Sequence, residues 1–257
     1  MARFPGTRSR PPLDEHVVVP ETTRDEVVRG RRVIAQPSSP PHGDRHFELD
    51  YVIRGSIRHG YVGSTDMITR FSNESDFATD TSVRKAGIDP ATGQRYLEEL
   101  AFEVVHTQSK RDMIERAEEL TARGVRRVIG IFVKEGVVRE WVPSEGAFRA
   151  FPPGSLIEDP CLSLPIRVES LLSAVEADNA VARALLAKEN PVLARLREQG
   201  KAQGKAEAVL TLLVSRGVPV SSAARAEILA CTDLDQLDRW LIQSVSVAAA
   251  SDLFQKP

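Results

Sequence analysis

Apolar positions recur at strand spacing through the middle of the chain, with one helical stretch among them. Runs rich in Val, Ile, Phe and Tyr, each bounded by turn formers, predict strands. They lie at residues 61–71, 77–86, 96–106 and 125–136, and in a hairpin over 137–151. Between the third and fourth runs, residues 110–124 carry apolar side chains three and four positions apart, which predicts an amphipathic helix that Gly124 ends. This order of strand, helix and strand predicts two parallel strands joined by a right-handed crossover.

Upstream of these strands, the pattern predicts two helices with a strand between them. Thr22 or Thr23 is a candidate N-cap for a short helix with acidic residues in its first turn, and Gly30 is its expected end. Residues 31–36 follow as a strand. After a proline-rich turn, Asp44 is the expected N-cap of the second helix. This segment therefore belongs to the same α/β region as the strands that follow it.

The last third of the chain is rich in Ala, Leu and Arg, and its pattern predicts helices. Their expected ranges are 167–189, 191–216, 221–230 and 234–244. In the last of these, Leu237, Trp240 and Leu241 share one apolar face and are expected to be buried. The chain as a whole is expected to hold a disordered basic tail over residues 1–20, an α/β core with a central mixed β-sheet flanked by helices over 21–165, and an all-helical region over 166–257.

The composition is that of an ordinary soluble globular protein, with 257 residues, 42% of them hydrophobic and 27% charged. The net charge of −2 excludes a globally basic nucleic-acid coat, although a local basic patch in a cleft can still bind phosphates. Cys161 and Cys231 lack the neighbours of a zinc site or a disulfide framework. No apolar run has the length of a secretory signal or a membrane span. We therefore expect a cytoplasmic protein without a membrane partner.

Two acidic residues stand in segments that are predicted to be buried strands. Asp80 lies in Thr-Asp-Thr-Ser-Val, and Glu103 lies in the most strand-like run of the chain. A carboxylate in a buried strand is costly unless it is paired or binds a metal. On neighbouring strands, two such carboxylates and a strand carbonyl form an oxygen-rich pocket suited to Mg²⁺ and to phosphodiester hydrolysis. The alternative is structural: Asp80 keeps an edge strand soluble, and Glu103 pairs with an arginine.

The order of these segments resembles the Uma-two family of restriction-endonuclease-like proteins, within the PD-(D/E)xK nuclease superfamily, over residues 21–142. The positions that carry the resemblance are Glu26 before Gly30-Arg31, His42-Gly43, Asp80 in place of the family's Pro-Asp-Val strand, and Glu103 at the start of its Glu-Val segment. The proline before the aspartate is absent from this chain. The resemblance implies a restriction-endonuclease-like α/β fold in which Asp80, Glu103 and Glu26 bind Mg²⁺ or Mn²⁺.

The family's lysine on the following helix is replaced in this chain. Its Asp-x-x-Glu-Lys is represented by Asp-Met-Ile-Glu-Arg, so Arg116 stands where the family has lysine. Arginine can stabilise phosphate charge in the transition state, but it is poorly suited to proton transfer. Lys110, near the start of the helix, is a candidate substitute, or else a solvated surface lysine. His42 and His106 are candidate general bases or neighbours of the metal, with a hydrogen-bonded structural role as the alternative for each.

The C-terminal segment over residues 200–254 resembles the helical tail that follows nuclease cores in Rpn-like, transposase-associated proteins. The features that carry this second resemblance are Gly200 and Gly204 at four-residue spacing and the apolar positions Leu237, Trp240 and Leu241. None of them is a catalytic candidate. The tail is therefore expected to pack internally, to form a homodimer or to contact a protein partner.

Together these features predict a metal-dependent DNA endonuclease with DNA as its partner. Dispersed arginines and lysines around the candidate residues are of the type that contacts phosphates, whereas the low aromatic content of 5% argues against a base-stacking platform. The main alternative is a catalytically inactive nuclease-fold protein that binds or scaffolds through its helical tail. A regulatory partner associated with a transposon or toxin is a third option.

Overall fold

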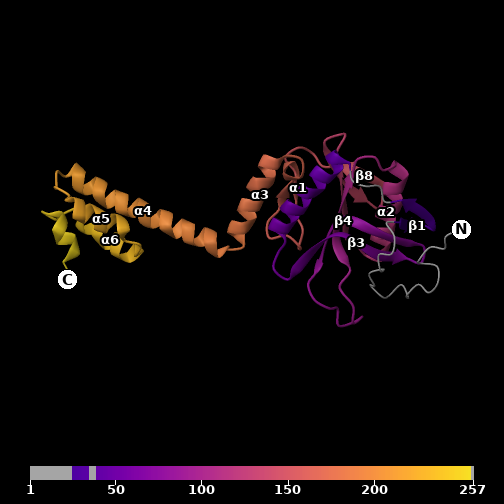
Figure 1. The fold of residues 1–257 in the computed structure, drawn as a ribbon, viewed down its shortest axis with the longest axis horizontal. Helices are drawn as coiled ribbons and strands as arrows, with labels where there is room; N and C mark the ends of the chain where they lie inside the picture. The colour runs from indigo at the N-terminus through magenta and orange to yellow at the C-terminus, as the bar shows by residue number, and fades with distance from the viewer. Residues whose placement is uncertain (1–24, 35–38, 256–257) are drawn as a thin grey trace. The chain divides into compact units, whose positions relative to one another are not determined.

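The computed structural model describes residues 25–34 and 39–255, and the chain forms two compact units. One unit extends to Lys188 and the other begins at Glu189; the ribbon of Figure 1 is coloured along the chain through both. Residues 166–188 belong to the first unit, so the compact units divide later in the chain than the boundary expected after residue 165. The disordered tail expected over residues 1–20 lies outside the described residues.

Eight strands of the described residues form one mixed sheet in the first unit. They are β1 (Asp25–Val28), β2 (Arg31–Ile34), β3 (Tyr61–Ser72), β4 (Ser75–Lys85), β5 (Glu98–Val105), β6 (Arg127–Phe132), β7 (Val137–Val142) and β8 (Ala147–Ala150). Their order is β2-β1-β4-β5-β6-β7-β8, and β3 pairs with β4 outside this path. The pair β5 and β6 is parallel, and the other pairs are antiparallel. The expected mixed sheet is confirmed, with β5 near its centre.

The parallel pair is connected by α2 (Lys110–Arg123), as the pattern predicted. Ser109 is its N-cap, and its side chain accepts a hydrogen bond from the backbone amide of Asp112. Gly124 ends the helix with a φ of 116°, a left-handed conformation that glycine adopts without a steric cost. The strand, helix and strand unit therefore holds Glu103 near the end of β5 and Arg116 in the middle of α2.

The first predicted helix is wrong, because residues 25–34 form a hairpin of β1 and β2 instead. Val27 pairs with Arg32, and Val28 pairs with Arg31. Arg29 and Gly30 connect the strands with φ values of 50° and 74°. Positive φ at both positions is typical of the two-residue turns that match the twist of a hairpin. Glu26 consequently lies on a strand and not in the first turn of a helix.

The second predicted helix, α1 (Pro40–Ser56), begins four residues earlier than the expected cap at Asp44. Ser39 is its N-cap position, with extended backbone, and proline occupies the first helical position. Proline suits that position because its missing N–H would have no partner within the helix and its φ is already helical. The earlier start places His42 and His46 one turn apart on the same helix.

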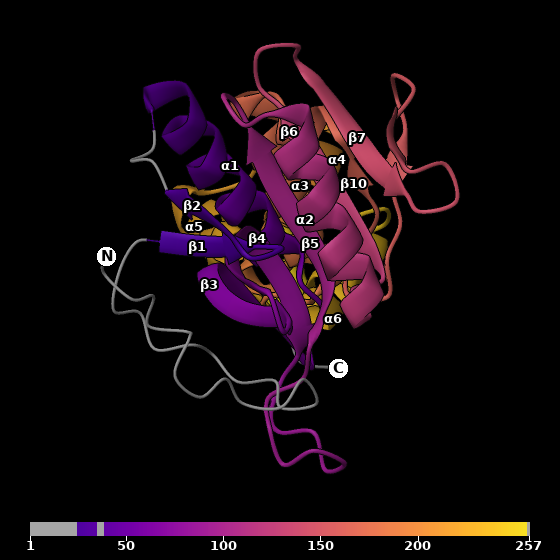
Figure 2. The ribbon, with the colours of Figure 1, turned by 90° about the vertical axis from the view of Figure 1, so that its right-hand side faces the viewer.

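The two helices cover the sheet through separate apolar clusters. Leu49, Val52 and Ile53 of α1 are buried with Leu100 and Phe102 of β5 among others. Ala117 and Leu120 of α2 are buried in a second cluster with residues of β5 and β6. Figure 2 looks onto the sheet from the side of α2, with β5 and β6 behind the helix. Each large apolar side chain that is fully buried contributes about 1.5–3 kcal/mol, so β5 is held firmly between the two layers.

The first unit is completed by short elements after β8. They are β9 (Leu156–Ile157), β10 (Ile166–Arg167), the 3-10 helix η2 (Val168–Leu171) and α3 (Ala174–Ala187). The two strands pair antiparallel as a small separate sheet. Lys188 follows α3, and its ammonium group donates hydrogen bonds to the carbonyls of Gly55 and Ile57 at the end of α1. This contact joins α1 to the end of α3 within the unit.

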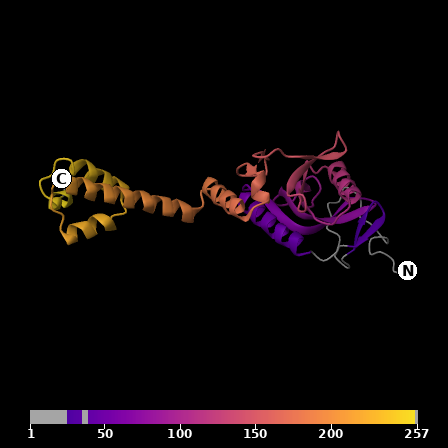
Figure 3. The same cartoon turned by 90° about the horizontal axis from the view of Figure 1, so that it is seen from above.

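The second unit is helical, as expected. It holds α4 (Pro191–Ser215), α5 (Ser222–Ala230), α6 (Leu234–Gln243) and the 3-10 helix η3 (Ala250–Phe254), and Figure 3 shows α4 with the shorter helices beside it. Leu237 is fully buried, Trp240 is buried with its indole N–H donating to the Leu253 carbonyl at 2.6 Å, and Leu241 is half-buried. No helix among the described residues combines the length and apolar character needed to cross a membrane.

Candidate functional site

The neighbouring strands β4 and β5 separate at the level of Asp80. Their ladder pairs Ser82 with Ala101 and Thr81 with Phe102, and the same register places Asp80 opposite Glu103. At that level the backbone amide of Val104 donates to the carboxylate oxygen Oδ2 of Asp80 at 2.5 Å. The side chain of Asp80 thus supplies an acceptor to the backbone of β5. This arrangement holds one oxygen of Asp80 in place and brings its carboxylate next to Glu103.

Glu103 is buried, with 3% of its surface exposed, and its two oxygens differ. Oε2 lies 3.6 Å from the guanidinium of Arg116, whereas Oε1 is buried and has no hydrogen-bond partner among the described residues. Burial raises the pKa of Glu103 well above its usual value; Arg116 opposes this, and the charges of Asp80 and Glu26 add to it. A buried acceptor without a donor is costly, so this oxygen is where a proton or a cation would be most favourable.

Arg116 extends from α2 into the same cluster of charges. One of its nitrogens donates to Glu26 at 2.7 Å, another donates to the Ala78 carbonyl, and the guanidinium lies over the ring of Phe77 with 4.4 Å to the centroid. Burial acts to lower the pKa of Arg116, but the carboxylates of Glu103 and Glu26 outweigh it and raise this pKa. Arg116 is therefore a fixed positive charge at the candidate site.

Glu26 is held by donors on both of its oxygens. Oε1 accepts a hydrogen bond from the backbone amide of Ala78 at 2.9 Å, and Oε2 accepts the one from Arg116. Its position on β1 therefore fixes the guanidinium of Arg116 against β4. Because both oxygens are already occupied by donors, Glu26 is less available to a cation than Glu103 is.

The N-terminal half of α1 brings two histidines to the other side of Asp80. His42 Nε2 lies 3.8 Å from Asp80 Oδ1, and His46 Nε2 lies 2.7 Å from the Asp80 carbonyl oxygen. One ligand atom from each of His42, His46 and Asp80 lies within 4.8 Å of the others, a grouping that can hold a metal ion. His46 was not among the residues singled out from the sequence. The helix that actually begins at Pro40 is what places it beside His42.

A fourth acidic residue borders this cluster. Asp66 of β3 lies opposite Asp80, because its neighbours Thr65 and Met67 pair with Thr81 and Thr79. Its φ of 49° is left-handed, a conformation that aspartate tolerates better than most residues. The sequence analysis did not identify Asp66, since its proximity to Asp80 depends on the register of two strands.

The structure places the two other candidates outside this cluster. His106 follows β5, and its Nδ1 lies 2.9 Å from the Ser39 hydroxyl, a contact that holds the start of α1. Lys110 is exposed at the first residue of α2, and its charge acts on Glu135. The residues brought together are therefore Glu26, His42, His46, Asp66, Asp80, Glu103 and Arg116.

No protein-family model and no curated protein matches the chain. Among solved structures, a protein from Anabaena variabilis, assigned to DUF820 and described as a candidate nuclease, matches with a TM-score of 0.50 and 16% sequence identity. The match covers 59% of this chain and 90% of the other. Identity this low shows the fold alone, and it confirms the restriction-endonuclease-like α/β fold.

Proposed function

We propose that the chain is a metal-dependent nuclease of the Uma-two type, which hydrolyses phosphodiester bonds in DNA. The observation that carries the proposal is the buried, unpartnered Oε1 of Glu103 beside the carboxylate of Asp80. Glu98 of β5 also has one buried oxygen without a donor, but Thr69 and Arg95 hold its other oxygen, and what distinguishes Glu103 is the charge of the carboxylates around it. The nuclease fold supports the proposal as a prior and does not replace the evidence from the site.

The donor set of the site fits a hard divalent cation. Glu103 Oε1 and Asp80 Oδ1 have no hydrogen-bond donor among the described residues, and oxygen ligands of this kind suit Mg²⁺ and Mn²⁺. The imidazoles of His42 and His46 lie next to Asp80, and nitrogen ligands favour the binding of Mn²⁺ over that of Mg²⁺. When bound, such an ion lowers the pKa of a water and neutralises charge on the phosphate.

The chain's own residues would orient and stabilise the reacting groups. Arg116 is held by Glu26 and by the carbonyl of Ala78, so its guanidinium is already oriented toward the carboxylates. A fixed cation of this kind stabilises the negative charge that develops on a transferring phosphate without having to reorganise. With its raised pKa, it cannot serve as the base.

His42 is the residue best placed to accept a proton. Its Nε2 lies close to Asp80 Oδ1, so a water beside the carboxylate would also lie near the imidazole. The hydrogen bond of His46 to the Asp80 carbonyl has a different effect, since it fixes the backbone of β4 at the catalytic position. In this proposal Asp80 and Glu103 bind the cation, Arg116 stabilises phosphate charge, and His42 assists the attacking water.

The alternative is a nuclease-fold protein that binds DNA or a partner without cleaving. Arg116 favours it, because its charge already pairs with Glu26 and approaches Glu103 where the family has the smaller lysine. An arginine that neutralises the acidic cluster weakens the attraction for a cation. Under both proposals we expect a cytoplasmic protein. Its second unit would form a homodimer or bind a protein partner.

A cleavage assay with supercoiled plasmid separates the two proposals. The full chain, Asp80→Ala and the control Asp235→Ala, which changes an exposed aspartate of α6, are purified in parallel and incubated with Mg²⁺, Mn²⁺ or EDTA. We expect cleavage by the parent and the control that requires metal and is lost in Asp80→Ala. Plasmid that stays intact with every metal, together with DNA retarded in a gel, would support the binding protein. Equal cleavage by Asp80→Ala would contradict the proposed role of Asp80, and a mock purification from cells without the chain shows whether a contaminant cuts.

A further inference from the structure

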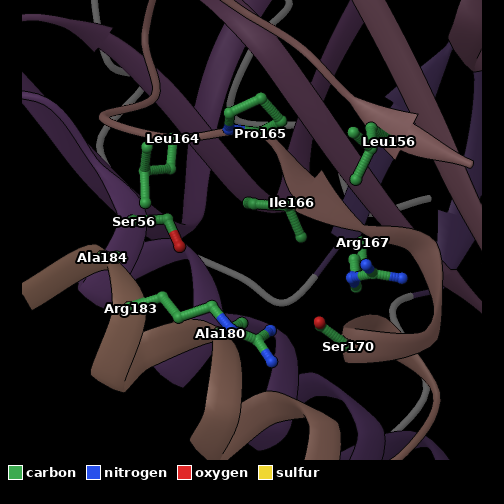
Figure 4. A pocket seen from close by; sticks show the side chains of 10 residues that line it. All are labelled: Ser56, Leu156, Leu164, Pro165, Ile166, Arg167, Ser170, Ala180, Arg183 and Ala184. Carbon is green, nitrogen blue, oxygen red and sulfur yellow. The ribbon is translucent and has the colours of Figure 1, made fainter. Parts of the chain in front are cut away.

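A second candidate site lies in the first unit, in a pocket that none of the candidate nuclease residues lines. Its volume is about 310 Å³, and it is bounded by the end of α1, the strands β9 and β10, η2 and α3. The lining residues, labelled in Figure 4, are Ser56, Leu156, Leu164, Pro165, Ile166, Arg167, Ser170, Ala180, Arg183 and Ala184. This volume is at the lower end of the range for pockets that hold small organic ligands.

One side of the pocket is a cluster of hydrogen-bond donors. Figure 4 shows the Ser170 hydroxyl on the same side as the guanidinium groups of Arg167 and Arg183. Ser170 is 1% exposed, and its buried hydroxyl oxygen has no hydrogen-bond partner in the part of the chain that the structure describes. Among the described residues, neither arginine takes part in a salt bridge. Two guanidinium groups and a buried hydroxyl without partners are suited to an anionic group with several acceptor oxygens.

Glu169, which precedes Ser170 in the chain, has one carboxylate oxygen engaged away from this cluster. The carboxylate of Glu169 accepts a hydrogen bond from the backbone amide of Gly154 at 2.6 Å. That hydrogen bond is the main cause of the lowered pKa of Glu169, and the charge of Arg167 adds to it. Glu169 thus influences Arg167 without neutralising the donors of Ser170 and Arg183.

The other side of the pocket is apolar and open to solvent. Leu156 is 48% exposed and Leu164 is 38% exposed, and Ile166, Ala180 and Ala184 complete the apolar lining. Covering large aliphatic side chains that are this exposed contributes favourably to the free energy of ligand binding. The pocket therefore offers donors at one side and an apolar surface at the other.

We propose that this pocket binds a small amphiphilic anion, with a carboxylate or phosphate group at Arg167, Arg183 and Ser170 and a short hydrocarbon body over Leu156 and Leu164. Carboxylate and phosphate share the required chemistry, because each is a compact anion with two or more acceptor oxygens. The proposal does not depend on the nuclease function, since it uses none of the residues of that site.

Calorimetric titration of the full chain with three probes tests the proposal. Octanoate and octyl phosphate carry the two anionic groups, and octanol has the same hydrocarbon chain without charge. We expect one anion to bind each chain, with a dissociation constant in the micromolar to millimolar range that about ten heavy atoms allow. Octanol is expected to bind at least tenfold more weakly than the better anion. The tighter of the two anions then identifies the head group.

Variants of the pocket distinguish binding here from binding elsewhere. Arg167→Gln and Arg183→Gln are each expected to weaken anion binding about tenfold, and the control Arg149→Gln, an exposed arginine of β8, should leave it unchanged. Ser170→Ala should weaken binding while leaving the thermal midpoint equal or higher, because it removes an unsatisfied buried hydroxyl. The proposal fails if no probe binds saturably, if octanol binds as tightly as the anions, or if the arginine variants bind like the parent.

Discussion

Two buried carboxylates of the first unit, Asp159 and Glu103, are treated in opposite ways by their surroundings. Asp159 accepts hydrogen bonds from Arg126 at 2.6 and 3.0 Å and from the backbone amide of Cys161 at 2.9 Å, with Arg127 at 3.6 Å. Glu103 has one guanidinium at 3.6 Å and one oxygen for which residues 25–34 and 39–255 supply no hydrogen-bond donor. The first acid is fully satisfied, and the second is not.

Their pKa values move in opposite directions for that reason. Burial acts to raise the pKa of Asp159, but the hydrogen bonds from Arg126 and Cys161 outweigh it and lower this pKa. Burial dominates for Glu103 and raises its pKa. A satisfied buried acid contributes to the fold, whereas an unsatisfied one in a cluster of like charges is a candidate for function. From this comparison we expect Asp159 to contribute to stability and Glu103 to the proposed activity, and each expectation can be tested.

The largest expected effect is on cleavage, in Glu103→Gln. The amide removes the negative charge at the proposed cation site, so metal-dependent cleavage should fall on the order of 10³-fold. The same change replaces an incompletely paired buried carboxylate with a neutral amide, so the free energy of unfolding should stay equal or increase. Plasmid cleavage and urea unfolding measure the two quantities, with Glu145→Gln in the exposed β7–β8 turn as the control. A variant that cleaves normally and unfolds more easily would reverse the comparison.

Asp159→Asn should show the opposite combination. Removing the charge leaves Arg126 and Arg127 without their shared carboxylate, and breaking a buried ion pair in this way costs about 3 kcal/mol. Cleavage per folded molecule should be unchanged, because the residue does not contact the carboxylates of the candidate site. Urea unfolding at neutral pH, followed by cleavage at a temperature where the variant is folded, checks both parts. Loss of cleavage in a fully folded variant would contradict the separation of the two acids.

How far the sequence predicts these two sites depends on the range of the interactions that form them. Glu103 and Asp80 could be selected as candidates because an acidic residue in an apolar strand is a local pattern. The partners of Asp159 were not, since Arg126 reaches it across 33 positions of the chain. Likewise Asp66 approaches Asp80 through the register of β3 and β4, which no local pattern reveals.

The elements themselves were predictable where one local signal was unopposed. Ser109 and Gly124 bound α2 with a cap and a left-handed stop, and both signals agree with the apolar period of the helix. Around Glu26 the signals conflicted. The threonines and acids favoured a helix start, but the adjacent Val27 and Val28 and the Arg29–Gly30 turn favoured the hairpin that forms. The sequence therefore predicted Glu26 in a helix, whereas the structure places it on β1, where it accepts a hydrogen bond from Arg116.

Arg116 is the residue that decides between the enzyme and the binding protein. Arg116→Ala should lower cleavage about 10²-fold, and Arg116→Lys should preserve or raise it, because lysine is a compact donor to water and phosphate. Lys110→Ala is the matched control, since Lys110 lies outside the cluster. Circular dichroism of each variant verifies folding, as Arg116→Ala leaves Glu26 without its partner. Cleavage lost in Lys110→Ala and retained in Arg116→Ala would move the catalytic role to Lys110. An inactive parent that gains cleavage as Arg116→Lys would be a nuclease fold inactivated at one position.

The smallest expected effect is the pH dependence of stability, which the two acids should shape with opposite signs. The pKa of Asp159 is lowered in the folded protein, so its contribution is present above its usual pKa of 3.8 and is lost as the pH falls through the folded value. The pKa of Glu103 is raised, so the folded state keeps a proton that the unfolded chain has lost. Its contribution is therefore present below the usual 4.5 and is lost as the pH rises toward the folded value. Each group changes the free energy of unfolding by at most about 1.4 kcal/mol per pH unit within its own window.

Urea unfolding between pH 3 and 8, with EDTA to remove divalent ions, measures how the free energy of unfolding depends on pH. The parent is compared with Asp159→Asn and Glu103→Gln. The deficit of Asp159→Asn relative to the parent should shrink as the pH falls below about 4, because the unfolded parent chain then gains a proton at Asp159 that the folded parent does not yet hold. The advantage of Glu103→Gln should instead grow above about pH 4.5, where the parent must either keep a proton or bury a charge. Adding Mn²⁺ should stabilise the parent more than Glu103→Gln, because the variant lacks one of the proposed carboxylate ligands and keeps His42, His46 and Asp80. If the free energies of unfolding of the two variants changed with pH in the same way, the surroundings of Asp159 and Glu103 would not differ in energy. The proposed functional role of Glu103 would then lose its physical basis.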